Sequence, residues 1–178
     1  MSRFPRTIAA VLGCFFSAPI CLAAGPDNKP LLTLYGRNSK ITETKVLRVT
    51  SEKEWKALWM KHKTGSPDPK VHPGDLEYAE LDFGKVMALA VFEGEASNCA
   101  GYTAHSISED RKRITVRLRA HKYGSAGETP ATQAWGILVL PRSGKEIVLE
   151  RDVRSEKKGP PVWKEWKRFP PLPRAKVP

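Results

Sequence analysis

The pattern of hydrophobic and polar residues divides the chain into short apolar segments separated by polar turns. Val86–Phe92 contains no polar residue, which predicts a strand buried on both faces. Ile114–His121 alternates between apolar and polar residues, which predicts a strand with one solvated face. Tyr102–Ser108 precedes it across the polar turn Glu109–Arg113, so the two segments predict a β-hairpin.

Other short segments predict the remaining strands. They are Leu31–Tyr35, Ile41–Val49, Tyr78–Phe83, Trp135–Leu140 and Lys145–Glu150. Pro141–Gly144 indicates a tight turn, after which Lys145–Glu150 is expected to return beside Trp135–Leu140. The segments together predict a mainly β (α+β) domain of about seven strands, arranged as a mostly antiparallel sheet or a sandwich.

One segment has the periodicity of a helix. Ser51 followed three positions later by Glu54 forms a capping box. Large side chains then recur from Trp55 at i, i+3, i+4 and i+7, which places them on one helix face. The pattern predicts a single amphipathic helix near residues 51–63, followed by a Pro- and Gly-rich surface loop over Thr64–Asp75.

The first 24 residues have the composition of a secretory signal peptide. Arg3 and Arg6 precede the apolar run Thr7–Phe16, and the small residues Ala23 and Ala24 follow. The apolar run is shorter than the roughly 20 residues that a membrane span needs. We therefore expect cleavage after residue 23 or 24 and an exported protein, periplasmic or extracellular, that is not an integral membrane protein. The remainder has the usual size of one domain.

Positive charge concentrates towards the C-terminal end. The whole chain has a formal net charge of +11. Arg154–Pro178 holds eight basic residues against Glu156 and Glu165, a net charge of +6. Its prolines exclude a long helix or a central strand. We therefore expect a β-rich domain over residues 31–153 and, where regular structure stops, a basic Pro- and Trp-rich tail over residues 154–178.

The tail combines aromatic and basic side chains, which predicts contact with an anionic surface such as a membrane face or an acidic polymer. The residues concerned are Trp163, Trp166, Lys167 and Arg168. The alternative is that the tryptophans pack on the sheet. Nucleic acid is not an expected partner, because the folded body of this exported protein shows no face that is both basic and aromatic.

Cys99 is the one cysteine outside the signal peptide, so no intramolecular disulfide can form. A catalytic cysteine needs a histidine or a helix N-terminus nearby. No helix is predicted after Cys99, and the six extended residues to His105 span roughly 20 Å. The densest group of possible metal ligands, in His72–Glu77, matches no ligand spacing. We therefore predict a non-enzymatic protein without a cofactor or metal.

The loop that follows the buried strand is a candidate recognition surface, because loops held on a rigid sheet commonly bind partners. The predicted partner-binding residues come from this loop and from the segment before the next long strand: Asn98, Cys99, Gly101, Tyr102, Gln133 and Trp135. In the alternative interpretation, Gly101 provides an unusual backbone angle and Tyr102 belongs to the core.

The order of several motifs resembles that of the PrcB C-terminal domain family, named for an exported subunit that supports a surface protease complex. The motifs are Glu54–Trp59, Leu81–Gly94, Gly101–Tyr102, Thr132–Gln133 and Leu138–Ser143. The similarity covers about Ile41–Val153. The chain departs from it at Cys99–Tyr102, where the family often has Thr-Gly-Gly-Tyr, and at Ala134–Trp135, where Pro-Tyr is frequent.

This resemblance implies a non-enzymatic domain whose partner is another protein, with a protease as one candidate, and it transfers no catalytic residue. The leading hypothesis is therefore an exported domain that binds or stabilises a protein partner. The alternatives are a protease-inhibitor-like module that inserts Asn98–Tyr102 into a cleft, an envelope polymer- or surface-binding protein that uses its tail, and, least favoured, an enzyme that uses Cys99.

Overall fold

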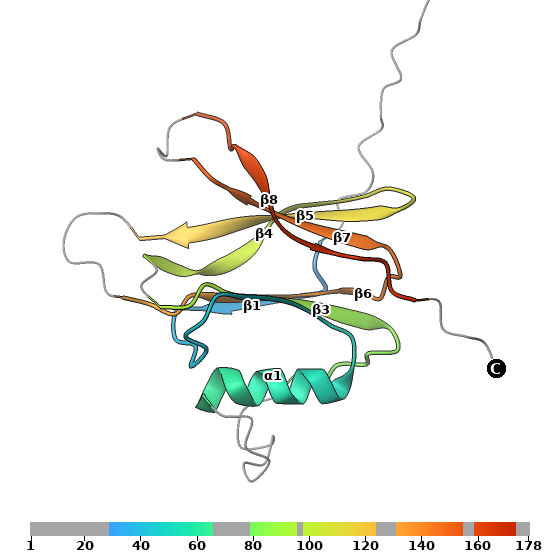
Figure 1. Cartoon of the computed structure of the whole chain (residues 1–178), viewed down its shortest axis with the longest axis horizontal. Coiled ribbons are helices and arrows are strands. Elements are labelled where there is room, and N and C mark those ends of the chain that lie inside the picture. The colour runs from blue at the N-terminus through green and yellow to red at the C-terminus, as the bar shows by residue number, and fades with distance from the viewer. Residues whose placement is uncertain (1–28, 66–78, 96–97, 124–130, 155–158, 174–178) are drawn as a thin grey trace, which may run out of the picture.

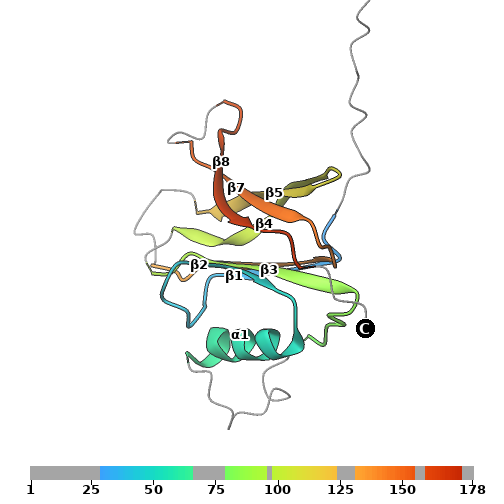
Figure 2. The same cartoon turned by 45° about the vertical axis from the view of Figure 1, so that its right-hand side comes forward.

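In the described part of the chain, two four-stranded sheets and one helix are stacked in three layers (Figures 1 and 2). The computed structural model describes residues 29–65, 79–95, 98–123, 131–154 and 159–173. The first sheet has the strand order β1 (Leu32–Gly36), β6 (Trp135–Pro141), β3 (Val86–Phe92) and β2 (Lys45–Val49). Helix α1 (Glu52–Thr64) covers its outer face. The second sheet has the order β4 (Cys99–Glu109), β5 (Arg113–Lys122), β7 (Glu146–Asp152) and β8 (Trp163–Phe169).

Strand β3 separates two hydrophobic cores. From Met87 onwards, every second side chain of the strand enters the core between the two sheets. From Ala88 onwards, every second side chain enters the core between the first sheet and α1. Because both of its faces are covered, the strand has no solvated side, and the prediction that Val86–Phe92 is buried on both faces is confirmed.

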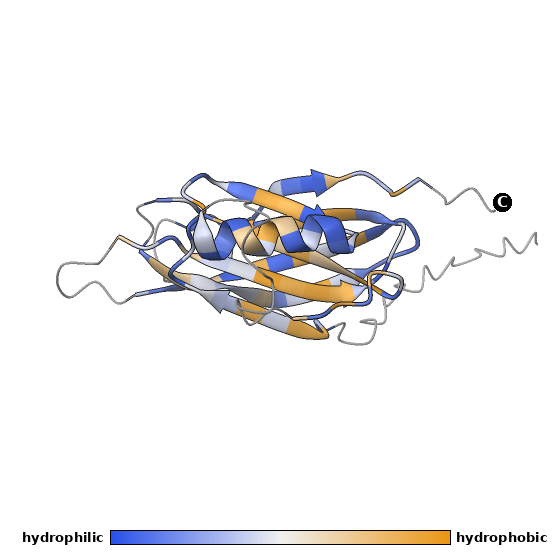
Figure 3. Cartoon of the chain, turned by 90° about the horizontal axis from the view of Figure 1, so that it is seen from below, coloured by the Kyte–Doolittle hydropathy of each residue, from blue (hydrophilic) through white to orange (hydrophobic). Residues whose placement is uncertain are grey.

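Helix α1 forms where the sequence predicts an amphipathic helix. Ser51 caps its N-terminus and accepts a hydrogen bond from the Glu54 N–H at 3.3 Å. The Glu54 carboxylate accepts from the Thr50 N–H at 2.9 Å, one residue before the position that a capping box uses. Gly65 ends the helix in a left-handed conformation with a φ of 82°. The first and last turns of α1 are mainly hydrophilic, and hydrophobic residues lie near its middle (Figure 3).

The predicted hairpin of β4 and β5 is confirmed, but the expected return of β7 beside β6 is wrong. Strand β6 lies in the first sheet between β1 and β3, whereas β7 runs parallel to β5 in the second sheet. Gly136–Leu140 is buried throughout, so β6 needs neighbours along both edges and cover on both faces. The turn after Pro141 therefore crosses from one sheet to the other.

Two segments that were predicted as strands differ from the structure: the described part of Tyr78–Phe83 is not a strand, and Ile41–Val49 is a strand only in its second half. Of Tyr78–Phe83, the structure describes the part from residue 79 onwards, which is not extended into a strand and leads into a turn. The Asp82 carbonyl accepts hydrogen bonds from the Lys85 and Val86 N–H groups at 2.8 and 2.9 Å, which closes this turn before β3. Within Ile41–Val49, pairing begins only at Lys45.

Strand β8 corrects the expectation that regular structure stops after residue 153. It pairs antiparallel with β7, and Trp166 and Phe169 pack against the core between the sheets. The flanking prolines precede or follow the strand, which lies at a sheet edge, where proline is tolerated. Prolines therefore excluded a central strand but not this edge strand, and the folded domain extends through Phe169.

Candidate functional site

The residues predicted to bind a partner come together at one end of the sandwich, but three of them are buried. Cys99 is 2% exposed and Tyr102 is 4% exposed, and Gly101 is buried between them. Asn98 is exposed, and Gln133 and Trp135 are half-buried. Cys99, Gly101 and Tyr102 are covered by the protein itself, so the structure gives no support to the prediction that they contact a partner directly.

Gly101 allows the two sheets to approach at this end. Its φ is +132°, a value that side chains rarely tolerate. A Cβ atom built at this position would lie 2.8 Å from both the Gly36 nitrogen and the Trp135 carbonyl oxygen. The Thr132 hydroxyl also donates to the Cys99 carbonyl at 2.7 Å. We call this end, formed by residues 98–102 and 132–135 with Gly36, the sheet junction.

Gln133 and Trp135 contribute to the junction mainly through contacts inside the protein. The Gln133 N–H donates to the Arg37 carbonyl at 2.9 Å, and Gln133 forms an isolated parallel bridge with Asn38. The Trp135 ring lies 4.3 Å from the ring of His62, which comes from the end of α1. Burial lowers the pKa of His62 to about 4, with a smaller contribution from Lys63. This histidine packs as a neutral side chain at neutral pH.

The environment of Cys99 opposes the chemistry of a nucleophile. Burial raises the pKa of its thiol, whereas a nucleophilic cysteine needs a lowered pKa. The thiol also donates a hydrogen bond to the Gly101 carbonyl, with an Sγ–O distance of 3.2 Å. Cys99 therefore packs as a small buried residue at the start of β4, and its contacts lend no support to catalysis.

The two tryptophans of the predicted tail have different positions on β8. Trp166 packs inwards, with its ring 5.6 Å from that of Tyr102. Trp163 lies on the second sheet beside His105, at a ring distance of 5.0 Å, and its ring faces the Arg117 guanidinium at 5.4 Å. The contact of Trp166 with Tyr102 fits the alternative that the tryptophans pack on the sheet, and both Trp163 and Trp166 are half-buried.

The two predicted basic contacts of the tail also differ. Arg168 makes ion pairs with Glu146 at 2.6 Å and with Glu165 at 2.5 Å, so its charge is already neutralised within the protein. Lys167 is exposed at the bulge of β8, opposite Leu149. The cluster of basic and aromatic residues is thus divided among the core, an ion-pair network and the surface.

The described residues contain no group of three or more His, Cys, Asp or Glu side chains placed to hold a metal ion. The possible ligands His72, Asp75 and Glu77 lie outside the described ranges. In the same part of the chain, α1 is too short and too polar to cross a membrane.

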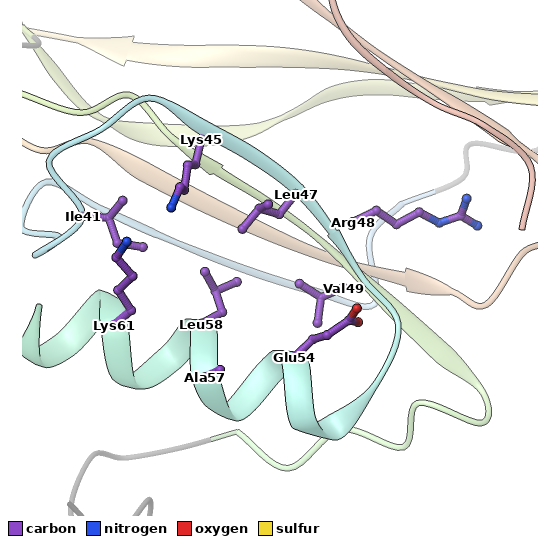
Figure 4. A pocket seen from close by; sticks show the side chains of 9 residues that line it. All are labelled: Ile41, Lys45, Leu47, Arg48, Val49, Glu54, Ala57, Leu58 and Lys61. Atoms are coloured by element: carbon purple, nitrogen blue, oxygen red, sulfur yellow. The ribbon is translucent and has the colours of Figure 1, made fainter. Parts of the chain in front are cut away.

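A groove lies between α1 and β2, the edge strand of the first sheet (Figure 4). Strand β2 is the last strand of its sheet, and no other strand of the described residues pairs with its outer edge. The groove has a volume of about 300 Å³. Its lining residues are Ile41, Lys45, Leu47, Arg48, Val49, Glu54, Ala57, Leu58 and Lys61.

The two walls of the groove have regular spacing. Lys45, Leu47 and Val49 alternate along β2, so their side chains share the face towards α1. The opposite wall is one stripe of α1, formed by Glu54, Ala57, Leu58 and Lys61 at i, i+3, i+4 and i+7. The floor is therefore apolar, and the charged side chains lie towards its ends.

The charges differ between the two ends of the groove (Figure 4). At one end, Lys45 from β2 and Lys61 from α1 both contact the Glu43 carboxylate, at 2.5 and 2.8 Å. Their hydrogen bonds lower the pKa of Glu43 to about 2, so it is ionised at neutral pH. At the other end, the Glu54 carboxylate accepts a hydrogen bond from the Thr50 N–H.

Arg48 anchors β2 from the side away from the groove floor. Its guanidinium donates to the carbonyls of Lys145 and Pro170 at 3.3 and 3.2 Å, and also to the carbonyl of Ser143. Its Nε is buried and has no hydrogen-bond partner among the described residues. Burial, with the nearby Arg142, lowers the pKa of Arg48. These contacts hold the groove wall against the turn after β6 and the segment after β8.

This groove was not among the predicted sites. Its one sequence signal is the second stripe of the helix, Glu54–Ala57–Leu58–Lys61, which adjoins the buried stripe that begins at Trp55. The edge position of β2 carries no comparable signal, because it depends on which strands pair across long separations in the sequence.

A scan against protein-family models, a search of curated proteins and a search of solved structures all found no match to this chain. The resemblance to the PrcB C-terminal domain family therefore stays a prediction.

Proposed function

We propose that this protein is an exported, non-enzymatic domain that binds a protein partner by accepting an extended segment of it along β2. The observation that carries the proposal is an unpaired strand edge beside an apolar groove. Added strands obtain affinity from main-chain hydrogen bonds and specificity from pockets for alternate side chains. The β2 edge and the pocket floor at Leu47 and Leu58 supply these two elements.

The charges at the edge favour a different chain over a second copy of this one. Strand β2 carries Lys45 at the edge, with Lys61 facing it across the groove, whereas the Arg48 guanidinium is turned away and bound to three carbonyls. Lysine on an edge strand commonly prevents self-association of this kind. The partner is therefore a segment of another protein, and it has acidic rather than basic groups near Lys45 and Lys61.

The predicted signal peptide at residues 1–24 supports a partner outside the cytoplasm, and the resemblance of Ile41–Val153 to the PrcB C-terminal domain family makes a protease a candidate partner. The protease-inhibitor alternative gains no support from the Asn98–Tyr102 loop, because most of its side chains are covered. The surface-binding alternative keeps the partly exposed Trp163 beside Arg117 and the exposed Lys167.

The test blocks the groove without disturbing the core. Ala57 is exposed and lines the groove, so Ala57→Arg places a long cationic side chain across it. Ala131→Arg makes the same change at an exposed position near the sheet junction. The wild-type chain and both variants are used to capture crosslinked envelope proteins, and a captured protein is then purified and titrated against each of them.

We expect Ala57→Arg to weaken binding of the purified partner at least tenfold and Ala131→Arg to leave it unchanged. Hydrogen exchange of the complex should show protection of the Lys45–Val49 amides. Equal binding by wild type and Ala57→Arg, or protection confined to other strands, contradicts the proposal. Loss of binding only in Ala131→Arg would place the partner-binding site at the sheet junction instead of the groove.

A further inference from the structure

The two ends of the groove differ in charge, and β2 runs from one end to the other. Strand β2 runs from Lys45, at the end where the two lysines lie, towards Val49, at the end where Glu54 lies (Figure 4). We call the first of these the lysine end. The two ammonium groups come from opposite walls, one from β2 and one from α1, and their side chains remain about a third exposed, at 34% and 35%.

The direction of β2 decides which terminus of an added strand reaches the lysine end. A strand parallel to β2 begins there, and its N-terminal ammonium would meet two like charges. An antiparallel strand ends there, and its C-terminal carboxylate would meet two opposite charges. The charges at the lysine end therefore favour the antiparallel orientation.

The lysine end is also bounded by the chain itself. Ile41 lines the groove beside Lys61 and is only 1% exposed, because the linker into β2 folds over this end (Figure 4). Residues Lys45–Val49 offer about five residues of edge, or roughly 16 Å. A segment that stops at the lysine end fits this bounded edge more readily than one that continues through it.

We propose that the groove binds the free C-terminus of a partner chain, antiparallel to β2, with its terminal carboxylate between Lys45 and Lys61. This inference rests on the proposed function and names the part of the partner that the site recognises. Glu43 holds both ammonium groups in the free protein, at 2.5 and 2.8 Å, and so occupies the position of the incoming carboxylate.

Glu43 therefore acts as an internal competitor. The terminal carboxylate replaces it on one or both lysines, and Glu43, which is exposed, swings into solvent. The two lysines then face the terminal carboxylate in place of Glu43, so that neither ammonium group is left unpaired. In this arrangement, removing the charge of Glu43 strengthens binding of a free C-terminus, and removing either lysine weakens it.

The apolar floor sets the side-chain preference of the bound segment. Alternate residues of an added strand point towards α1, where Leu47, Ala57 and Leu58 form the floor. We expect an apolar residue at or near the C-terminal position and again two residues before it. The residues between them face away from the floor and are less restricted.

The experiment uses two displayed libraries of random peptides, one with free C-termini and one in which the random segment is internal. Peptides selected on the wild-type chain are synthesised with a fluorescent label, each as a free acid and as a C-terminal amide. Their dissociation constants are measured by fluorescence anisotropy for the wild-type chain and for Glu43→Gln, Lys61→Gln and Ala57→Arg.

We expect the free acids to bind at least tenfold tighter than the amides, and 0.5 M salt to narrow this difference. Glu43→Gln should tighten binding of the free acids several-fold, and Lys61→Gln should weaken it to the level of the amides. Glu52→Gln and Lys53→Gln are the matched controls, because they make the same charge changes at exposed positions of α1 outside the groove. Both should leave binding unchanged.

The outcomes separate this inference from the proposed function. If acids and amides bind equally and Ala57→Arg abolishes both, the terminal carboxylate is not recognised and strand addition stands. The same conclusion follows if the internal library yields equally tight peptides that Ala57→Arg excludes. If Ala57→Arg has no effect on any selected peptide, the groove is not the binding site and both proposals fail.

Discussion

The sheet junction and the β2 groove lie in the same sandwich but differ in composition and in how much of their surface is exposed. The junction contains the one cysteine of the described residues, a Gly-Tyr pair and a tryptophan, yet most of this surface is turned inwards. The groove is built from ordinary Lys, Leu, Ala and Glu residues, yet it leaves a strand edge and an apolar floor uncovered. Unusual residues therefore mark where this protein packs tightly, and a missing strand neighbour marks where it can bind.

The largest expected effect tests the structural role of the junction. Gly101→Ala adds a Cβ against two backbone atoms at a φ of +132°, so we expect a loss of about 3 kcal/mol or more in the free energy of unfolding. Urea denaturation followed by circular dichroism measures it. Gly144→Ala is the control, because a Cβ there meets nothing within 4 Å. Equal stability of the two variants would show that the junction is not tightly packed.

The second effect concerns the histidine that joins α1 to the junction. The pKa of His62 falls from 6.5 to about 4 on folding, so between these values the unfolded chain binds the extra proton. The free energy of unfolding is therefore highest above pH 6.5 and falls as the pH drops towards 4, by about 3 kcal/mol in total. Urea denaturation across this range measures the loss.

His62→Gln removes the titrating group and serves as the control for this pH dependence. It should flatten the curve between pH 6.5 and 4 even though it also lowers stability at pH 7, because the ring of His62 packs against Trp135 and Phe92. An unchanged slope in the variant would assign the pH dependence to other groups. Glu43 and Asp152, whose pKa values are both lowered to about 2, titrate mainly below this range.

A smaller effect tests whether β8 belongs to the folded domain. Trp166→Ala removes a half-buried ring that packs on Tyr102, so we expect a loss of about 2 kcal/mol in the free energy of unfolding. Trp163→Ala, on the same strand, removes contacts with Arg117 and His105 and should cost about 1 kcal/mol or less. If both variants are as stable as wild type in urea, β8 is a detachable tail, as the sequence predicted.

The smallest expected change in stability belongs to the groove. Ala57→Arg alters an exposed helix position, so we expect the free energy of unfolding to change by no more than about 0.5 kcal/mol. The same urea denaturation measures it, beside the large loss of peptide binding described above. A strongly destabilised Ala57→Arg chain would mean that the groove is part of the packing, and the contrast with the junction would disappear.

The elements with a local pattern were predictable from the sequence. The fully apolar Val86–Phe92, the alternating Ile114–His121 and the helix from Ser51 onwards each carry a periodicity that matches the observed element. Burial on both faces of β3 also followed from its composition, because a strand without polar residues needs cover on each side. These features led to the α+β class that the structure shows.

The errors concern pairing and exposure. The turn after Pro141 looked like a hairpin, but β7 pairs with β5 and β8 in the other sheet. Trp163–Phe169 looked like a tail because prolines surround it, yet it completes the second sheet as an edge strand. Cys99 and Tyr102 were predicted to contact a partner, but both are buried where Gly101 lets β4 approach Gly36 and Trp135 closely.

The sequence by itself determined where strands and the helix form, because hydrophobic periodicity and capping act over a few neighbouring residues. Only the tertiary structure decided which strands were left at the sheet edges, which side chains were covered and which charges met. Lys45 and Lys61 are sixteen positions apart in the chain, and they face each other across the groove only because β2 ends the first sheet beside α1. Long-range pairing, which no local pattern encodes, therefore created the candidate site.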